Sequence, residues 1–547
     1  MSPSTGRSVR QYRIVAAFVA IAGLVFVGTM LQLGSSPQLR LLASGFGTMK
    51  DFTSDRRVYE IEGLSLGEPF TDDVLLGTED GHIESLREAL RSRFAATLAR
   101  AEKSPAYPNC TSRPQRYTKA MLHSEEIVTS WQKTRRIAIV SIAVNLHNSE
   151  GIIPSQALAL LEAVFLLLRR NRVFVSIYEN GSSDSTRRLL ADFASALQAI
   201  GVDGLWLHTS RMMSDFRVTD RIVMLSEIRN LALAPMIPYA ADDSGAGTLL
   251  FMNDVMTCSS DILELIHQQR LQKAEMVMGT DWGTFNRTIR QDEPGYLSQE
   301  DSEYDPKSPP YTQAPRLYDL WVTRGISGDL VYPFRTPGGY TPISDSEDCV
   351  TDAFSTESKS IRERWLESRP FPVYSGWGGM AAFDASLFTS QHLRFRSSTT
   401  SGWSGGSSTG ALGPWGRLVS SEGYLASDCP GASECEYIAR DIWNLRDGKA
   451  RIVLAPQART AYNIDDWLVM AGAVPPTRHV ESDLEDDDLI DWSRLNVPDT
   501  VVCIASRDQD GTSLDAWSED NHRVRLDPVW RPGNNSVAKI DDHESHK

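Results

Sequence analysis

The stretch Thr248-Leu-Leu-Phe-Met-Asn-Asp-Val255 decides the fold that we expect for this chain. It is an apolar run that ends abruptly in Asn253 and Asp254, as a buried strand does when it delivers polar residues at its carboxyl end. The earlier stretch Tyr178-Glu-Asn-Gly-Ser-Ser-Asp-Ser-Thr186 has the same character. Open α/β sheets place their ligand sites at the carboxyl ends of strands, so the two stretches together predict a nucleotide-sugar site.

The polar end of the later strand suits a metal ion. Sugar transfer from a nucleotide donor expels a diphosphate, and a divalent cation neutralises the developing charge as a Lewis acid. Because such cations prefer carboxylate oxygens, Asp254 is the predicted metal ligand, and Asn253 beside it is predicted to contact the donor. The simpler alternative is that both residues form only a turn or the N-cap of the next helix.

The loop after the earlier strand carries short polar side chains around Gly181. On such a tight turn, Glu179, Asn180 and Asp184 are predicted to hydrogen-bond the base and ribose of the donor. The two loops therefore predict complementary halves of one donor site.

Strands and helices alternate between residues 136 and 279. We expect strands at 136–144, 172–178, 204–208, 248–252 and 275–279, and helices at 154–170, 186–200, 222–236 and 259–272. This β-α-β-α order predicts an α/β fold with a mainly parallel sheet flanked by helices. Further along, 318–329 and 373–383 are aromatic and glycine-bearing segments that suit either acceptor-sugar recognition or ordinary loops.

The N-terminus predicts a membrane anchor. Residues 14–33 contain no charged side chain, and three arginines precede them, so the span is long enough for a bilayer and its N-side stays cytosolic. We expect a cytosolic tail (1–13), an anchor (14–33), a stem (34–131), a luminal catalytic domain (132–480) and an acidic extension (481–547). A cleaved signal peptide, with a site near Ser35 and Ser36, is the alternative, but the apolar run is long for that.

A luminal body makes the six cysteines disulfide candidates. Cys429 and Cys435 are close enough to close a small loop, but six cysteines allow fifteen complete pairings and the sequence does not choose. Asn-X-Ser/Thr glycosylation patterns begin at Asn109, Asn180, Asn286 and Asn534. A glycan at Asn180 would block the predicted donor loop. The net charge of −16 argues against nucleic-acid binding, which needs clustered Lys and Arg.

Five motifs in one order resemble the fungal α-1,3-mannosyltransferases related to the cryptococcal capsule-associated proteins, a family of type II membrane glycosyltransferases. The motifs lie at 178–186, 227–233, 250–255, 373–380 and 433–435, and the resemblance covers roughly Arg135 to Asn463. It implies a GT-A-like domain that transfers mannose from GDP-mannose to a mannoside, or longer glycan, in α-1,3 linkage. Dependence on Mn²⁺ (or Mg²⁺) and a Golgi membrane location are also implied.

The resemblance assigns roles to individual residues. Glu179 and Asp184 would contact the nucleoside, Arg229 would pair with the diphosphate through its planar guanidinium, and Asp254 would hold the metal. Asn180 and Asn253 complete the predicted donor site.

Glu434 is the predicted catalytic carboxylate. In a retaining transfer it would act either as a nucleophile beneath the anomeric carbon or as a group that stabilises the oxocarbenium-like species. Asp329 is a weaker candidate for binding the acceptor.

The chain departs from the family pattern at one motif. The family favours Ser-Cys-Trp-Asn-Gly where this chain has Ser375-Gly-Trp-Gly-Gly379, so Gly376 and Gly378 replace a cysteine and an amide. Acceptor choice or a local disulfide is therefore expected to differ. Two alternatives to mannose transfer stay open: the same machinery with another donor, such as a xylosyl nucleotide, or a non-catalytic scaffold in polysaccharide assembly or export.

Overall fold

The computed structural model separates Met1–Arg56 from a compact unit formed by Arg57–Lys547. The described residues are 57–70, 79–110, 138–168, 171–210, 221–241, 247–286, 313–332, 353–396, 432–473, 488–495, 497–498, 500–503 and 522–525. The predicted tail and anchor (1–33) lie outside these ranges. Among the residues that are described, no helix is both long and apolar enough to span a membrane.

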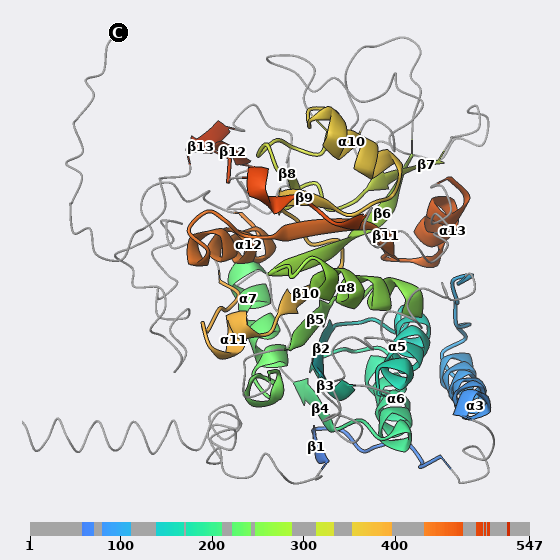
Figure 1. The fold of residues 1–547 in the computed structure, drawn as a ribbon. Coiled ribbons are helices and arrows are strands. Elements are labelled where there is room, and N and C mark those ends of the chain that lie inside the picture. The colour runs from blue at the N-terminus through green and yellow to red at the C-terminus, as the bar shows by residue number, and fades with distance from the viewer. Residues whose placement is uncertain are drawn as a thin grey trace, which may run out of the picture. The chain divides into compact units, whose positions relative to one another are not determined.

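One large sheet organises the described part of the second unit (Figure 1). Its strands are β1 (Val58–Glu62), β2 (Ala138–Leu146), β3 (Asn171–Asn180), β4 (Gly204–Ser210), β5 (Thr248–Met252), β6 (Met276–Asn286), β7 (Gln313–Leu317), β8 (Arg324–Gly325), β9 (Phe371–Ser375), β10 (Met380–Asp384) and β11 (Ile452–Ala461). The order is β1-β4-β3-β2-β5-β10-β6-β11-β9-β8, with β7 paired to β6. A separate pair joins β12 (Thr500–Cys503) to β13 (His522–Arg525).

The first half of the sheet is parallel, as expected. β1, β4, β3, β2 and β5 run parallel to their neighbours. The second half is mixed, because β10 lies antiparallel between β5 and β6, while β11 is again parallel to β6. No helix precedes β10 directly, and without a helical crossover a strand need not run parallel to its neighbours. The expectation of a mainly parallel sheet therefore holds for one half only.

Helices cover both faces of the sheet (Figure 1). They are α3 (Glu79–Ala99), α5 (Ile153–Leu167), α6 (Thr186–Ile200), α7 (Arg221–Leu233), α8 (Ser259–Leu271), α10 (Lys359–Leu366), α11 (Ser386–Thr389), α12 (Glu434–Leu445) and α13 (Ile464–Ala473). α3, α5, α6 and α8 pack together, whereas α7 contacts α12.

Alternate residues of the strands point to opposite faces and build two separate cores. In β2, Val140, Ile142 and Val144 join the core beneath α5 and α6, while Ile139 and Ala143 join the other. The helices α3, α5, α6 and α8 thus form one layer and α7 belongs to the opposite one.

One disulfide ties the segment after α3 to the body. Cys110 and Cys258 are bonded, with Cα atoms 5.7 Å apart, and Cys258 is the N-cap residue of α8. Cys435 is free and buried in the first turn of α12, so the small loop considered between Cys429 and Cys435 is not closed. Cys429 itself lies outside the described residues.

Candidate active site

The carboxyl ends of several parallel strands meet at one edge of the sheet. β2, β3, β5, β6 and β11 run in the same direction, so the residues that follow them gather at that edge. His147, directly after β2, is bonded through Nδ1 to the carbonyl oxygen of Asn180 at 2.8 Å. The backbones of Met256 and Ala461 bond each other and so join the ends of β5 and β11. The predicted donor loops therefore lie at one edge of the sheet, and their binding of a donor stays a prediction.

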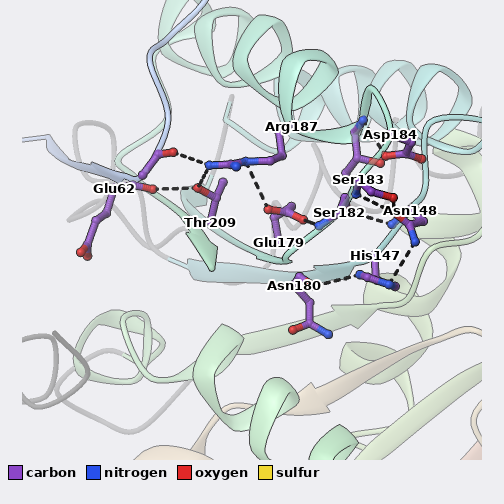
Figure 2. Close-up of polar contacts among 12 residues, drawn as sticks. Glu62, His147, Asn148, Glu179, Asn180, Ser182, Ser183, Asp184, Arg187 and Thr209 are labelled. Carbon is purple, nitrogen blue, oxygen red and sulfur yellow. Dashed lines mark hydrogen bonds and ion pairs between the residues drawn. The ribbon is translucent and has the colours of Figure 1, made fainter. Parts of the chain in front are cut away.

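Two carboxylates brace the loop after β3 from inside (Figure 2). Glu179 accepts a hydrogen bond from the backbone N–H of Ser182, and its other oxygen lies 3.7 Å from Nε of Arg187. Asp184 accepts from the backbone N–H groups of Thr186, at 2.9 Å, and Glu150, at 3.1 Å. Both carboxylates are thus occupied in holding the loop, and their contact with a nucleoside stays a prediction.

Asn180 differs from these two braces. Its side chain points away from the Glu179 and Asp184 carboxylates in Figure 2. The residue is only 6% exposed, so a glycan would not fit there without opening the loop. Asn180 therefore suits the donor site better than it suits glycosylation.

Sequence reasoning missed the loop after β2. Asn148 is exposed, has a positive φ of 50°, and accepts a hydrogen bond from the N–H of Ser183 at 2.9 Å. Its own N–H donates to Oγ of Ser182 at 2.8 Å. The signal was available, because His147 and Asn148 come within four residues of the end of the predicted strand 136–144. The two loops interlock, so this second loop positions the first.

Asp254 follows β5 and is partly exposed. Its Oδ2 accepts a hydrogen bond from Oγ of Ser149 at 3.4 Å. Burial raises the pKa of the Asp254 carboxyl to about 6, although the nearby charge of Arg229 opposes that shift. Asn253 is fixed beside it, because its N–H donates to the carbonyl of Gly379 at 2.9 Å. A carboxylate that pays for partial burial in this way is well placed to bind a cation.

The donor set fits a cation held mainly by substrate. Within the described ranges there is no group of three or more His, Cys, Asp and Glu residues that could hold a metal ion. Mg²⁺-like ions are commonly bound by one or two carboxylates, with substrate phosphates and water as the other ligands. Asp254 can therefore serve as the single carboxylate ligand that the protein supplies.

Glu434 begins α12 and lies in a buried ion pair. Nε of Arg229 lies 3.0 Å from Oε1 of Glu434, and the two side chains are 6% and 1% exposed. Oγ of Ser433, the N-cap residue, donates to Oε2 of Glu434 at 3.1 Å. Both carboxylate oxygens of Glu434 therefore have partners.

Three aromatic rings enclose the Arg229 guanidinium. Its central carbon lies 4.3 Å from the ring centroid of Trp377, 5.4 Å from that of Phe251 and 5.3 Å from that of Phe395. Such contacts stabilise a desolvated cation. Arg229 faces Glu434 in this structure, so its pairing with a diphosphate stays a prediction, and its observed contacts fit a role in orienting Glu434.

Arg229 also connects the two predicted carboxylates. Its charge acts on the carboxyl of Asp254 as well as on its partner Glu434. Residues far apart in the sequence, at the end of β5 and the start of α12, are therefore brought to one charged centre.

A second acidic pair lies next to this centre and was missed from the sequence. Asp281 in β6 is 2% exposed, and its Oδ1 accepts from the N–H of Asp319 at 3.2 Å. Burial raises the pKa of Asp281 to about 6. Burial also raises the pKa of Asp319 well above its usual value, and the charges of Asp281 and Glu434 add to that shift. The available signals were a predicted strand just before Asp281 and an aromatic segment around Asp319.

Asp329 lies elsewhere in its segment. Its Oδ2 accepts from Oγ of Ser327 at 3.1 Å and its carbonyl accepts from the N–H of Gly325 at 2.9 Å, which shapes the turn after β8. Its role in acceptor binding stays a prediction. The other aspartate of this segment, Asp319, lies within electrostatic reach of Glu434.

The departures at Gly376 and Gly378 have a packing reason. Gly378 has a φ of +60°, and a Cβ there would lie 2.0 Å from the carbonyl oxygen of Gly279. A Cβ on Gly376 would lie 2.4 Å from Sδ of Met278. At Gly378 this segment therefore approaches the backbone of β6 too closely for the side chain that the family pattern carries, whereas at Gly376 the neighbour is a flexible methionine side chain.

Comparisons with known proteins agree with the motifs. The family model described as Cryptococcal mannosyltransferase 1 matches residues 139–409. Over 429 residues the chain is 26% identical to the α-1,3-mannosyltransferase CMT1 of Cryptococcus neoformans var. neoformans serotype D, which covers 73% of this chain and 76% of that protein.

Similar solved structures include the mannosyltransferase PcManGT from Pyrobaculum calidifontis in complex with GDP-Man and Mn²⁺, with a TM-score of 0.28 and 12% identity over 69% of this chain and 68% of that one. Another is S. aureus TarS 1–349, with a TM-score of 0.26 and 10% identity over 64% of this chain and 69% of that one. The sequence relationship is the decisive comparison, and it agrees with the resemblance expected from the five motifs: this chain is similar to the cryptococcal α-1,3-mannosyltransferase.

Proposed function

We propose that this chain transfers mannose from GDP-mannose to a mannoside in α-1,3 linkage, with retention of configuration. The observation that carries the proposal is the buried ion pair of Arg229 and Glu434, whose guanidinium also acts electrostatically on Asp254 at the carboxyl edge of the sheet. The activity in the name of its cryptococcal relative supports the choice of sugar and linkage. The parallel half of the sheet, with helices on both faces, supports a GT-A-like domain.

Each part of the site has a task in this reaction. The loops at 147–150 and 180–186 would hold the nucleoside, and Asp254 would hold Mn²⁺ or Mg²⁺ together with the diphosphate. When bound, the cation neutralises charge on the departing diphosphate. Asn253, fixed to Gly379, keeps Asp254 aimed at that position.

Of the two roles open to Glu434, its contacts favour the electrostatic one. Both of its oxygens have partners and the side chain is 1% exposed, so a nucleophilic attack would first have to break the ion pair with Arg229. A fixed negative charge beneath the sugar stabilises an oxocarbenium-like species without any such movement. Arg229 would keep that charge in place.

The setting of the enzyme is also part of the proposal. We place it in the Golgi membrane, with residues 14–33 as a single type II anchor and the catalytic body in the lumen. The Cys110–Cys258 disulfide supports an oxidising compartment. Asn109 is exposed and begins a glycosylation pattern, so it is the acceptor expected to carry a glycan.

A donor panel tests the function. Purified full-length chain is incubated with GDP-mannose, a xylosyl nucleotide and other nucleotide sugars, each with simple mannosides and with or without Mn²⁺. We expect metal-stimulated transfer from GDP-mannose alone, an α-1,3 product by NMR, and a loss of turnover by orders of magnitude in Glu434→Gln with donor binding preserved. Transfer from another donor would replace the mannose assignment, and no transfer from any donor would favour the scaffold alternative.

A further inference from the structure

An exposed pair of aromatic rings lies at the edge of the charged centre. Tyr318 is 55% exposed, the highest value for a large apolar or aromatic side chain among the described residues. Its ring centroid lies 4.9 Å from that of Tyr462, with the planes tilted by 50°. Tyr462 follows β11 at the carboxyl edge of the sheet and is itself only partly buried.

Asp281 fixes both rings in place. The N–H of Tyr318 donates to the carbonyl oxygen of Asp281 at 3.0 Å, and the hydroxyl of Tyr462 donates to its Oδ2 at 3.5 Å. The N–H of Asp319 donates to Oδ1 of the same carboxyl at 3.2 Å. One nearly inaccessible carboxyl thus holds a wall that consists of two rings and Asp319, a residue that is only partly buried.

This wall adjoins the predicted reaction centre. The charges of Glu434 and Arg229 shift the pKa of Asp319 in opposite directions. The charge of Asp254 contributes to the raised pKa of Tyr462. Arg229 also has an Nη1 atom that is buried and has no hydrogen-bond partner within the described part of the chain. A polar group left unpaired at such a position is costly unless a ligand completes it.

We propose that Tyr318, Tyr462 and Asp319 form the subsite for the acceptor sugar, a hexopyranoside. The inference rests on the proposed glycosyl transfer and names where its second substrate binds. A pyranose ring has an apolar C–H face that packs on an aromatic ring, while its hydroxyls seek carboxyl oxygens. Exposed Tyr318 supplies the first contact and Asp319 the second.

The state of the acidic pair agrees with this use. Burial raises the pKa of Asp281 to about 6, and burial together with the charges of Asp281 and Glu434 raises the pKa of Asp319 well above its usual value. A carboxyl that keeps a proton both donates and accepts hydrogen bonds, which matches a sugar hydroxyl. Asp319, the more exposed of the two, is the one placed to meet it.

Acceptor kinetics of Tyr318→Ala test the subsite. We expect the acceptor KM to rise about tenfold, the size of a lost aromatic stacking contact, while the donor KM stays within twofold. Tyr318→Phe keeps the ring and should keep the acceptor KM. Tyr59→Ala is the matched control, because Tyr59 is also exposed but lies in β1, at the far edge of the sheet.

Asp319→Asn should lower acceptor affinity without changing binding of GDP-mannose. Either variant raising the donor KM as much as the acceptor KM would overturn the assignment, and so would an unchanged acceptor KM in Tyr318→Ala.

Direct binding separates this inference from the proposed function. Methyl α-mannoside binding to the full-length chain is followed by saturation-transfer NMR, which needs no turnover. Signal in the wild type that disappears in Tyr318→Ala but not in Tyr59→Ala supports the subsite even if no donor is consumed. Equal signal in the wild type and Tyr318→Ala overturns the subsite even if GDP-mannose is an active donor.

Discussion

Replacing Arg229 by Met removes the charge from the buried pair and keeps a side chain of similar length. The change leaves Glu434, which is 1% exposed, with two side-chain hydrogen-bond donors, the Ser433 hydroxyl at 3.1 Å and the weaker Cys435 thiol at 3.6 Å. Removing one partner of a buried ion pair costs about 3–5 kcal/mol, because the other charge stays buried without compensation. Loss of the cation from the three-ring cage adds about 1 kcal/mol, which contacts of the Met sulfur with the same rings offset in part. We therefore expect Arg229→Met to lower the free energy of unfolding by about 4 kcal/mol.

Glu434→Gln should cost less, about 2 kcal/mol, because the cage and the nearby acidic side chains still surround the guanidinium. In the double variant neither charge is left alone, so the two losses should not add. The expected coupling between the sites is about 2 kcal/mol or more. This asymmetry and non-additivity follow from the geometry of the pair.

Urea unfolding followed by tryptophan fluorescence measures these values, since the chain has 13 Trp residues. Lys359→Met is the matched control, because Lys359 lies 3.7 Å from Glu363 and the two side chains are 90% and 53% exposed. An exposed pair of this kind contributes at most about 0.5 kcal/mol. If Arg229→Met costs no more than Lys359→Met, or if the two single losses add in the double variant, the pair does not hold Glu434 in the way argued here.

Four further outcomes are expected. Asp254→Asn should abolish metal-stimulated transfer with an unchanged circular dichroism spectrum, and near-normal turnover would remove Asp254 from the site. Because the pKa of Asp254 is raised to about 6, protons compete with the cation below that pH, so the apparent Mn²⁺ affinity measured by titration should fall about tenfold per pH unit there and stay flat above it. Cys110→Ser opens a crosslink between residues 148 positions apart and should lower the free energy of unfolding by up to about 5 kcal/mol, with dithiothreitol then having no further effect on the urea midpoint. In sealed vesicles the body should resist protease and carry N-glycans, and digestion beyond Arg40 would contradict the luminal assignment.

Much of the first half of the fold follows from local sequence signals. The helix predicted at 186–200 is observed as α6 (Thr186–Ile200), and the one predicted at 259–272 as α8 (Ser259–Leu271). Leucine-rich periodicity, capping residues and apolar runs act within a few positions, so they are visible in the sequence. β10 lies antiparallel between β5 and β6. This pairing depends on contacts between strands that are far apart in the sequence, so no local pattern predicts it.

The candidate site also has a part that local sequence predicts and a part that it does not. Asp254 and Asn180 were predictable because each ends an apolar strand, and the carboxyl edge of a sheet is where ligands bind. The pairing of Arg229 with Glu434 joins α7 to α12, and the aspartate pair joins β6 to a loop after β7. Such contacts depend on how distant elements pack, so a single sequence names the residues without naming their partners. The same reason hid the Cys110–Cys258 disulfide among fifteen pairings.

Acidic side chains outnumber basic ones around Arg229, and this excess favours binding of a cation. Asp254, Asp281, Asp319 and Glu434 lie within electrostatic reach of one another or of Arg229, which is the cation at their centre. Arg324 also interacts electrostatically with Asp319, yet burial still raises the pKa values of the three aspartates more than the nearby cations lower them. A divalent cation at Asp254 would relieve that imbalance, and its binding should therefore release protons in proportion to the carboxyls that it returns to the ionised form.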